Sequence, residues 1–131
     1  MPSTETLERY VLRVEKNDHA GAAEEFYMPD ASIQENQSAP RIGRHTQVER
    51  ERVLMTKVRT LTSQCVRPIF VSGERVVIRW QFRFDWLDDT VTEMEEVACQ
   101  RWEGERIAEE IFFYDPAQRV PKKLTKTIPD A

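Results

Sequence analysis

The sequence is poor in the residues that support several common kinds of site. It has two cysteines and two histidines among 131 residues, and its four glycines are dispersed along the chain. A zinc site needs clustered cysteine and histidine ligands, and a phosphate-binding loop needs clustered glycines. No serine or cysteine stands in a nucleophile motif. We therefore expect neither a metal nor another cofactor, and we interpret His19 and His45, at predicted helix starts, as capping or surface residues.

Long apolar runs and an excess of positive charge are also lacking. No apolar segment approaches the roughly 20 residues of a membrane span, and residues 1–5 lack the basic and apolar regions of a signal peptide. The 19 Lys and Arg are interleaved with 23 Asp and Glu, for a net charge of −4. We therefore expect no nucleic-acid or membrane partner. The separated Cys65 and Cys99 favour a reduced, cytoplasmic protein.

The most informative stretch is residues 76–86, where polar and apolar side chains alternate from Ile78 onward. The large apolar residues are Ile78, Trp80, Phe82, Phe84 and Trp86. A period of two is typical of a strand with one face on a core. We expect this strand in the middle of an antiparallel meander, with Trp80 and Phe82 against helices and Arg79 and Arg83 on the outer face.

Three helices are predicted before this strand. Ser3 can cap the first, whose apolar stripe is Leu7, Tyr10, Val11 and Val14. Asp18 caps a short second helix, whose buried side is Ala22, Ala23 and Phe26. Residues 27–30 are predicted to be a turn in which Pro29 ends that helix. A capping-box spacing at Thr46 opens a third helix that runs to about Arg59 on Val48, Met55 and Val58.

The remaining segments are predicted to be strands. A short edge strand is expected at residues 31–36, and longer strands at 61–71, 92–102 and 107–114, with Pro68 implying a bulge or an edge position. The chain is expected to form a single domain over residues 1–116, followed by a polar tail at 117–131, mobile from Lys122 onward. The fold class is α+β: a strongly bent, mostly antiparallel sheet wrapped around three N-terminal helices packed at one end.

Several short segments in this order carry a family resemblance. They are residues 8–11 on the first helix, 26–35 at the first strand, 43–44 before the third helix, and 102–107 with 110–115 near the end. Together they resemble the nuclear transport factor 2-like superfamily, in its SnoaL-like and ketosteroid-isomerase-like branch, over about Leu7 to Tyr114. The resemblance implies a cone whose open end is a deep, mostly apolar pocket. It does not by itself imply a function.

The resemblance also implies two catalytic candidates. Glu35 stands where ketosteroid isomerases keep the carboxylate base, and Tyr10 matches their oxyanion-donating tyrosine. The alternatives are a solvated glutamate at a strand end and a tyrosine that is plain core. Ala98 falls where the isomerases have a second, protonated acid, and alanine donates nothing. Ketosteroid-type isomerisation is therefore not predicted.

The predicted strand faces add further pocket candidates. Met94, Glu96, Ala98, Gln100 and Trp102 share the inward face of one strand, and Ala108, Glu110, Phe112 and Tyr114 share a face of the last. The expected pocket-lining residues are Trp80, Phe82, Glu96, Gln100, Trp102, Glu110 and Tyr114. Inward carboxylates must be hydrated, paired with arginine, or catalytic. Pairing with an arginine is the ordinary outcome.

Two classes of function remain open. One is a cofactor-free isomerase or cyclase that moves a proton on a small hydrophobic carbonyl compound, with Glu35 as base and Tyr10 or Tyr114 as oxyanion donor. The other is a non-catalytic module that binds a small hydrophobic ligand or acts through dimerisation. The last strand is apolar on both faces, with Ile107, Ile111 and Phe113 on one, so we expect a homodimer that covers this outer face.

Overall fold

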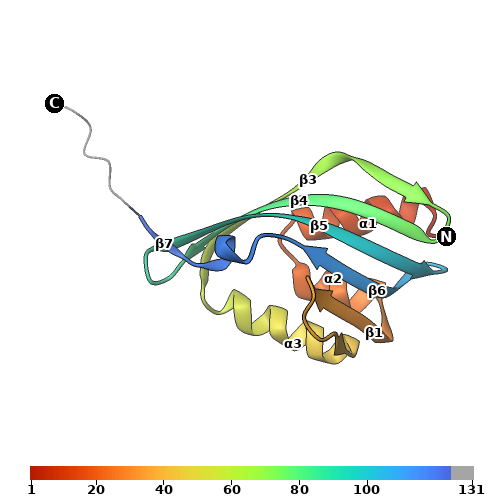
Figure 1. Cartoon of the computed structure of the whole chain (residues 1–131), viewed down its shortest axis with the longest axis horizontal. Coiled ribbons are helices and arrows are strands. Elements are labelled where there is room, and N and C mark those ends of the chain that lie inside the picture. The colour runs from red at the N-terminus through yellow and green to blue at the C-terminus, as the bar shows by residue number, and fades with distance from the viewer. Residues whose placement is uncertain (125–131) are drawn as a thin grey trace.

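The computed structural model describes residues 1–124 and has the α+β architecture expected from the sequence. One curved sheet carries all three helices on the same side (Figure 1). The helices are α1 (Thr4–Glu15), α2 (His19–Phe26) and α3 (Arg44–Met55). The core lies between these helices and the inner face of the sheet.

The sheet has seven strands in the order β2-β1-β6-β5-β4-β3, with β7 paired to β5. The strands are β1 (Tyr27–Glu35), β2 (Arg41–Ile42), β3 (Val58–Ser72), β4 (Arg75–Trp86), β5 (Thr90–Glu103), β6 (Arg106–Phe113) and β7 (Lys122–Lys123). β1 runs parallel to β6, and the other pairs run antiparallel. The β3–β6 meander is the long part of the sheet.

The first two predicted helices are confirmed, and the third is shifted. Ser3 Oγ accepts a hydrogen bond from Thr6 N at 3.0 Å, and Asp18 Oδ1 accepts one from Gly21 N at 3.0 Å. α3 begins at Arg44 after Gly43, whose φ of 111° suits glycine, and it has no side-chain cap. The predicted capping box at Thr46 is wrong, because Thr46 already lies inside the helix.

The predicted turn at residues 27–30 is also wrong, since β1 starts at Tyr27 and continues through Glu35. β1 lies between β2 and β6 and is not the edge strand that the sequence suggested. A register irregularity against β6 between Tyr27 and Ser32 spans Pro29, which has no N–H to donate to a regular ladder. Such an irregularity allows a proline within an interior strand.

β4 confirms the predicted alternation. Ile78 and Trp80 are buried, and Trp80 lies in register with Cys65 of β3 and Glu96 of β5. Arg79 and Arg83 are exposed on the outer face as predicted. The bulge expected at Pro68 is confirmed by a register shift in β3 between Val66 and Phe70. β4 is therefore the central strand of the meander, with its aromatic face toward the helices.

One predicted strand face is wrong. Trp102 pairs with Ile107, whereas the next pair joins Arg101 to Glu109, so β6 holds one extra residue at this point. The bulge turns Ile107 into the core, where it is fully buried. Ile107 therefore does not share the outer face with Ile111 and Phe113.

After β6 the chain turns back onto the sheet. Pro116–Arg119 forms a short 3-10 helix, η1, and Lys122 pairs with Val91 of β5. Gln118 Oε1 accepts a hydrogen bond from Glu95 N at 2.6 Å. The predicted tail at 117–131 thus begins with residues packed on β5, and residues 125–131 lie outside the described part. No helix within residues 1–124 is long and apolar enough to cross a membrane.

Packing of the inner β4 face should dominate the stability of the fold. Ile78→Ala removes a fully buried side chain and leaves a cavity, so the free energy of unfolding should fall by about 2–5 kcal/mol. Leu12→Ala, at an exposed position of α1, should change it by about 0.5 kcal/mol or less. Urea denaturation followed by tryptophan fluorescence measures both. Equal losses in the two variants would contradict this placement of the core.

Candidate functional site

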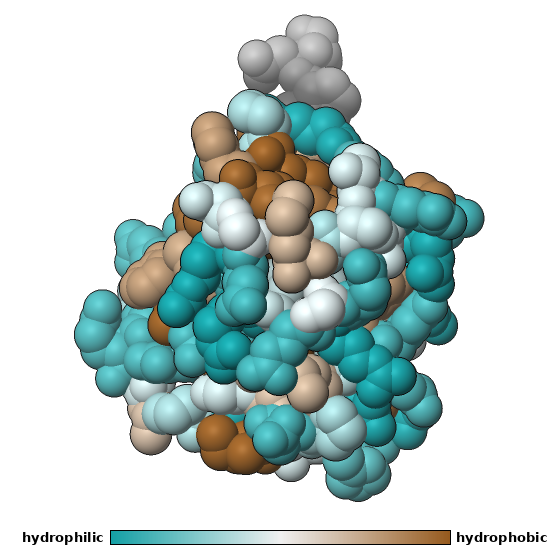
Figure 2. Space-filling view, turned by 90° about the vertical axis from the view of Figure 1, so that its right-hand side faces the viewer, coloured by the Kyte–Doolittle hydropathy of each residue, from teal (hydrophilic) through white to brown (hydrophobic). Residues whose placement is uncertain are grey.

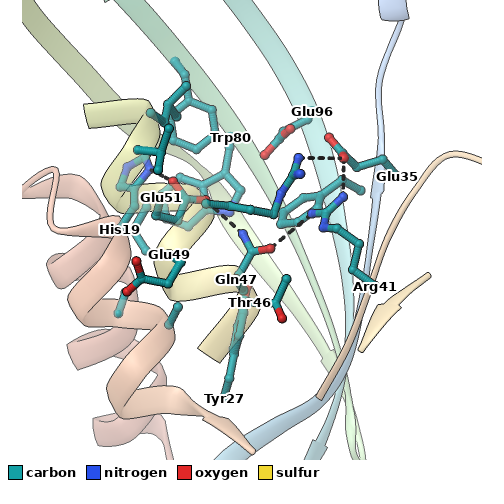
Figure 3. A pocket seen from close by; sticks show the side chains of 18 of the residues that line it. His19, Tyr27, Glu35, Arg41, Thr46, Gln47, Glu49, Glu51, Trp80 and Glu96 are labelled. Atoms are coloured by element: carbon teal, nitrogen blue, oxygen red, sulfur yellow. Dashed lines mark hydrogen bonds and ion pairs between the residues drawn. The ribbon is translucent and has the colours of Figure 1, made fainter. Parts of the chain in front are cut away.

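A cavity of about 660 Å³ opens between the three helices and the inner face of the sheet. Its apolar wall is made by Trp80, Phe82, Phe84, Met94 and Phe112. The rings of Trp80 and Phe82 are stacked, with centroids 5.7 Å apart. Figure 3 shows Glu35 and Glu96 on one side of this pocket and His19 and Glu51 on the other. Carboxyl groups thus face an aromatic surface across a cavity large enough for a small organic molecule.

Glu35 reaches the cavity, but it is held by several donors. Arg41 Nη1 donates to its Oε2 at 2.6 Å, and the Tyr114 hydroxyl donates to its Oε1 at 2.9 Å. Arg119 Nη2 lies 3.0 Å from Oε1, and Arg50 Nη2 lies 3.9 Å from Oε2. Burial raises the pKa of Glu35, but the hydrogen bonds from Arg41 and Tyr114 and the arginine charges outweigh it and hold the pKa below its ordinary value.

These contacts argue against Glu35 as a general base. A working base needs apolar neighbours and no bound arginine, because an arginine stabilises the ionised form and lowers basicity. The structure places Glu35 at the predicted cavity, but in the opposite electrostatic environment. Glu35 is better described as a carboxylate whose ionised form is stabilised by an ion cluster.

Glu96 meets the conditions that Glu35 does not. Its side chain lines the cavity, in register with Trp80 on β4, and it has no hydrogen bond or ion pair within residues 1–124. Burial raises its pKa to about 8, assisted by the negative charges of Glu110, Glu35 and Glu51. The inward face predicted for Glu96 is therefore correct.

Tyr10 belongs to a buried polar network behind the cavity wall. Gln100 Nε2 donates to the Tyr10 hydroxyl at 3.3 Å and to Glu110 Oε2 at 2.5 Å, and Trp102 Nε1 donates to Gln100 Oε1 at 2.9 Å. The Tyr27 hydroxyl donates to Glu110 Oε1. Burial raises the pKa of Glu110 to about 7, against the hydrogen bonds from Gln100 and Tyr27.

This network fixes the position of the Tyr10 hydroxyl. The Tyr10 hydroxyl accepts from Gln100, and its own hydrogen has no acceptor among residues 1–124, while Tyr10 itself lines the cavity. Gln100, Trp102 and Glu110, expected to line the pocket, lie buried in the layer beneath it. They orient Tyr10 instead of touching the cavity. Trp80 and Phe82 line it as expected. Tyr114 does not belong to the lining, and it contacts the site through its hydrogen bond to Glu35.

His19 and Glu51 were not predicted at the site. His19 Nε2 lies 2.9 Å from Ser63 Oγ, and burial lowers its pKa to about 4, so the imidazole is neutral at pH 7. Glu51 Oε1 accepts from Gln47 at 3.0 Å, and burial raises its pKa. Sequence spacing could have revealed His19, because it precedes Ala22, Ala23 and Phe26 at i, i+3, i+4 and i+7 on one helix face.

Arg119 was also missed, since it belongs to the predicted tail. Its guanidinium lies over the Tyr114 ring, 5.4 Å from the centroid, and faces Glu35. No pattern around Pro116–Arg119 signals this contact. Within residues 1–124, no group of three or more His, Cys, Asp and Glu is arranged to hold a metal ion.

Comparison with known proteins identifies relatives of the fold. No family model and no curated protein sequence matches the chain. A nuclear transport factor 2-like protein of unknown function from Burkholderia pseudomallei superposes with a TM-score of 0.72 at 16% identity, over 87% of this chain and 91% of that one. A putative SnoaL-like polyketide cyclase from Mesorhizobium loti gives 0.71 at 20%, over 87% and 100%.

A third similar structure holds a ligand. It is a hypothetical protein with a ketosteroid isomerase-like fold from Catenulispora acidiphila, in complex with trimethylamine, with a TM-score of 0.72 at 12% identity over 88% of this chain and 89% of that one. These similarities confirm the predicted nuclear transport factor 2-like fold. At such identities they show the fold, and the chemistry must be argued from the site.

The ion cluster around Glu35 makes its pKa dependent on Arg119. Replacing this arginine in Arg119→Gln removes one of the charges that hold the carboxylate ionised, so the pKa of Glu35 should rise. A titration of the glutamate side-chain carboxyl signals by ¹³C NMR measures the shift. Arg52→Gln, on the exposed side of α3, should leave the Glu35 pKa unchanged. An unchanged value in Arg119→Gln would contradict the cluster.

Proposed function

We propose that this chain, which has the nuclear transport factor 2-like fold, is a cofactor-free enzyme that moves a proton on a small carbonyl compound. The observation that carries the proposal is Glu96, a carboxyl group without a partner among the described residues, set in an aromatic cavity with a pKa of about 8. A general base works best when its pKa lies near the working pH. With a pKa of about 8, a minority of Glu96 is ionised at pH 7 and is available as the base.

Two groups share the chemistry. The Glu96 carboxylate takes a proton from the carbon next to the substrate carbonyl, and the electron pair of the broken C–H bond moves onto the carbonyl oxygen as an enolate. The Tyr10 hydroxyl donates a hydrogen bond to that oxygen. In a β,γ-unsaturated carbonyl compound the enolate extends over the neighbouring C=C bond, and protonated Glu96 returns the proton to the γ carbon, so the double bond moves into conjugation and the carbonyl re-forms. In a cyclase, the enolate carbon would instead attack a second carbonyl of the same substrate, and protonated Glu96 would give its proton to the alkoxide that forms there.

Glu35 has a supporting role in this proposal. Its environment lowers its pKa, whereas that of Glu96 raises it. Two carboxyl groups whose pKa values are shifted in opposite directions take different roles. One is a fixed anion, and the other gains and loses the proton. The names of similar structures, a SnoaL-like polyketide cyclase and a ketosteroid isomerase-like fold, support this class of reaction.

A second candidate is a non-catalytic pocket protein for a small ligand. The pairing of Glu35 with Arg41 and Arg119 favours it, because the position that resembles the base of ketosteroid isomerases is occupied by an ion pair. The trimethylamine complex of one similar structure shows that a protein of this fold holds a small organic molecule. The two candidates differ in whether Glu96 exchanges protons with a bound compound.

Exchange of carbon-bound protons separates the two candidates. In D₂O, the protein should accelerate deuterium incorporation next to the carbonyl of at least one member of a panel of small cyclic ketones and β-keto esters, followed by ¹H NMR. Glu96→Gln should slow this exchange by about 10²–10⁴-fold. The rate should rise with pH as Glu96 ionises, with a midpoint of about 8.

Glu35→Gln is the matched control. It removes a negative charge that raises the pKa of Glu96, so the exchange should persist with its midpoint shifted to lower pH. Loss of exchange in Glu35→Gln but not in Glu96→Gln would reverse the assignment of the base. Binding without exchange across the whole panel would favour the non-catalytic candidate.

We also propose that the chain forms a homodimer through the outer face of the sheet. Register places Phe70, Val77, Cys99 and Ile111 in one row across β3 to β6 on that face. Phe70 is 63% exposed and Phe113 is 41% exposed. Figure 2 looks onto the end where β3 and β4 join, and a hydrophobic patch interrupts the hydrophilic surface there. A second copy of the sheet would cover this row.

The dimer should be sensitive to charge on this face. Light scattering at micromolar concentration should give twice the 15.4 kDa chain mass for the unchanged protein. Phe113→Glu should give a folded monomer, because a carboxylate buried against an apolar partner loses its hydration. Leu87→Glu, at an exposed position in the β4–β5 turn, should stay dimeric. A monomeric unchanged protein would refute the proposal.

A cytoplasmic location is proposed from the cysteines. Cys65 and Cys99 are free thiols, and Cys99 is partly exposed on the sheet. Free thiols persist in reducing compartments. Recovery of the native protein from a secreted or periplasmic fraction would contradict this location.

A further inference from the structure

Three arginines converge on one carboxylate at the cavity. Arg41 and Arg119 lie 2.6 and 3.0 Å from the Glu35 oxygens, and Arg50 lies 3.9 Å away. One carboxylate balances one guanidinium, so this group carries a net positive charge. Arg41 Nε is also buried without an acceptor among residues 1–124. The cluster has both charge and hydrogen-bonding capacity that Glu35 does not use.

The other acids of the cavity do not remove this excess. Glu49 forms its ion pair with Arg52, with Oε1 2.8 Å from Arg52 Nη1. Burial raises the pKa of Glu96 to about 8, and Glu35 and Glu51 together are two carboxyl groups against three arginines. Lys57 also lines the cavity and adds a further positive charge. The cavity is therefore positive on the arginine side, although the whole chain has a net charge of −4.

The arginine cluster is open to a ligand. The side chains of Arg50 and Arg119 are 47% and 52% exposed, and both line the same cavity as Glu96 and Tyr10. Exposed arginine side chains can turn toward a ligand without disturbing the core. Glu35 and Glu96 lie on the same side of the pocket in Figure 3, and the charges of Glu35 and Arg119 act on the pKa of Glu96, so a ligand that reaches Glu96 also lies near the arginines.

We propose that the substrate carries a carboxylate, which binds to Arg50 and Arg119, in addition to the carbonyl group that faces Tyr10 and Glu96. The planar guanidinium donates two parallel hydrogen bonds to a carboxylate, so a pair of arginines recognises this group by geometry as well as charge. The bound carboxylate would act as an anchor, because it would hold the reacting carbon of the substrate at a fixed distance from Arg50 and Arg119. The carbonyl part of the proposal rests on the proposed function, and the carboxylate part rests on the arginine cluster alone.

A keto acid and its methyl ester test the anchor. The probes are 4-oxocyclohexanecarboxylate and the corresponding methyl ester, which differ in charge and little in shape. The intact protein should bind the acid about tenfold more tightly than the ester by NMR titration, the expected gain for hydrogen bonds to a charged group. Arg50→Gln with Arg119→Gln should remove this preference, and Arg79→Gln, on the exposed outer face of β4 and away from the cavity, should preserve it. Circular dichroism checks that each variant is folded.

The outcomes of this test are separate from those of the proposed function. Glu96→Gln should abolish proton exchange while it keeps the preference for the acid, because it leaves the arginines in place. If no exchange is found but the preference holds, the anchor stands and the catalytic proposal fails. Three outcomes would overturn the proposed carboxylate site. They are equal affinity for acid and ester, an equal loss of affinity for both in the arginine variants, and no binding of either at millimolar concentration.

Discussion

Enclosing several carboxyl groups in one cavity is the constraint on which the site depends. An isolated buried carboxylate is too costly to keep, so each one must be paired or protonated. Here both solutions occur side by side. Arginines keep Glu35 ionised, and burial favours the protonated form of Glu96, with a pKa of about 8. The negative charge of Glu35 itself raises the pKa of Glu96, so the ion cluster helps to set the pKa of Glu96.

The curved sheet makes this juxtaposition possible. β5 carries Glu96 on its inner face, and β1 and β6 bring Glu35 and Tyr114 to the neighbouring edge of the cavity. The stacked Trp80 and Phe82 face the same space and keep its dielectric low. Low dielectric strengthens both effects, since it penalises an unpaired charge and reinforces a paired one. Rigid strands hold these groups at fixed positions, whereas the arginines reach in from a helix, a short strand and the C-terminal segment.

The alternation of β4 and β5 allowed much of this to be predicted. A strand period of two determines which side chains share a face, so the inward positions of Trp80 and Glu96 followed from sequence alone. What could not be predicted depends on contacts between distant segments. The bulge that turns Ile107 inward leaves no signal in an apolar run, and the return of Arg119 to Glu35 depends on the pairing of β7 with β5. His19 was not predicted at the cavity because a histidine at a helix start is usually a capping or surface residue, although its spacing places it on the buried face of α2.

The shift of the proposed base from Glu35 to Glu96 follows from the same physics. A base position is defined by its environment: an apolar wall, access to the cavity and freedom from arginine. The position that resembles the isomerase base lacks that environment, because Arg41, Arg50 and Arg119 surround Glu35. Glu96 lies two residues before Ala98 on the same inner face of β5, where burial raises its pKa more than the charge of Arg119 lowers it. Positions two residues apart on a strand share a face, so an acid at position 96 faces the cavity just as one at position 98 would. The fold can therefore carry the base on β5 in place of Glu35 without a change in topology.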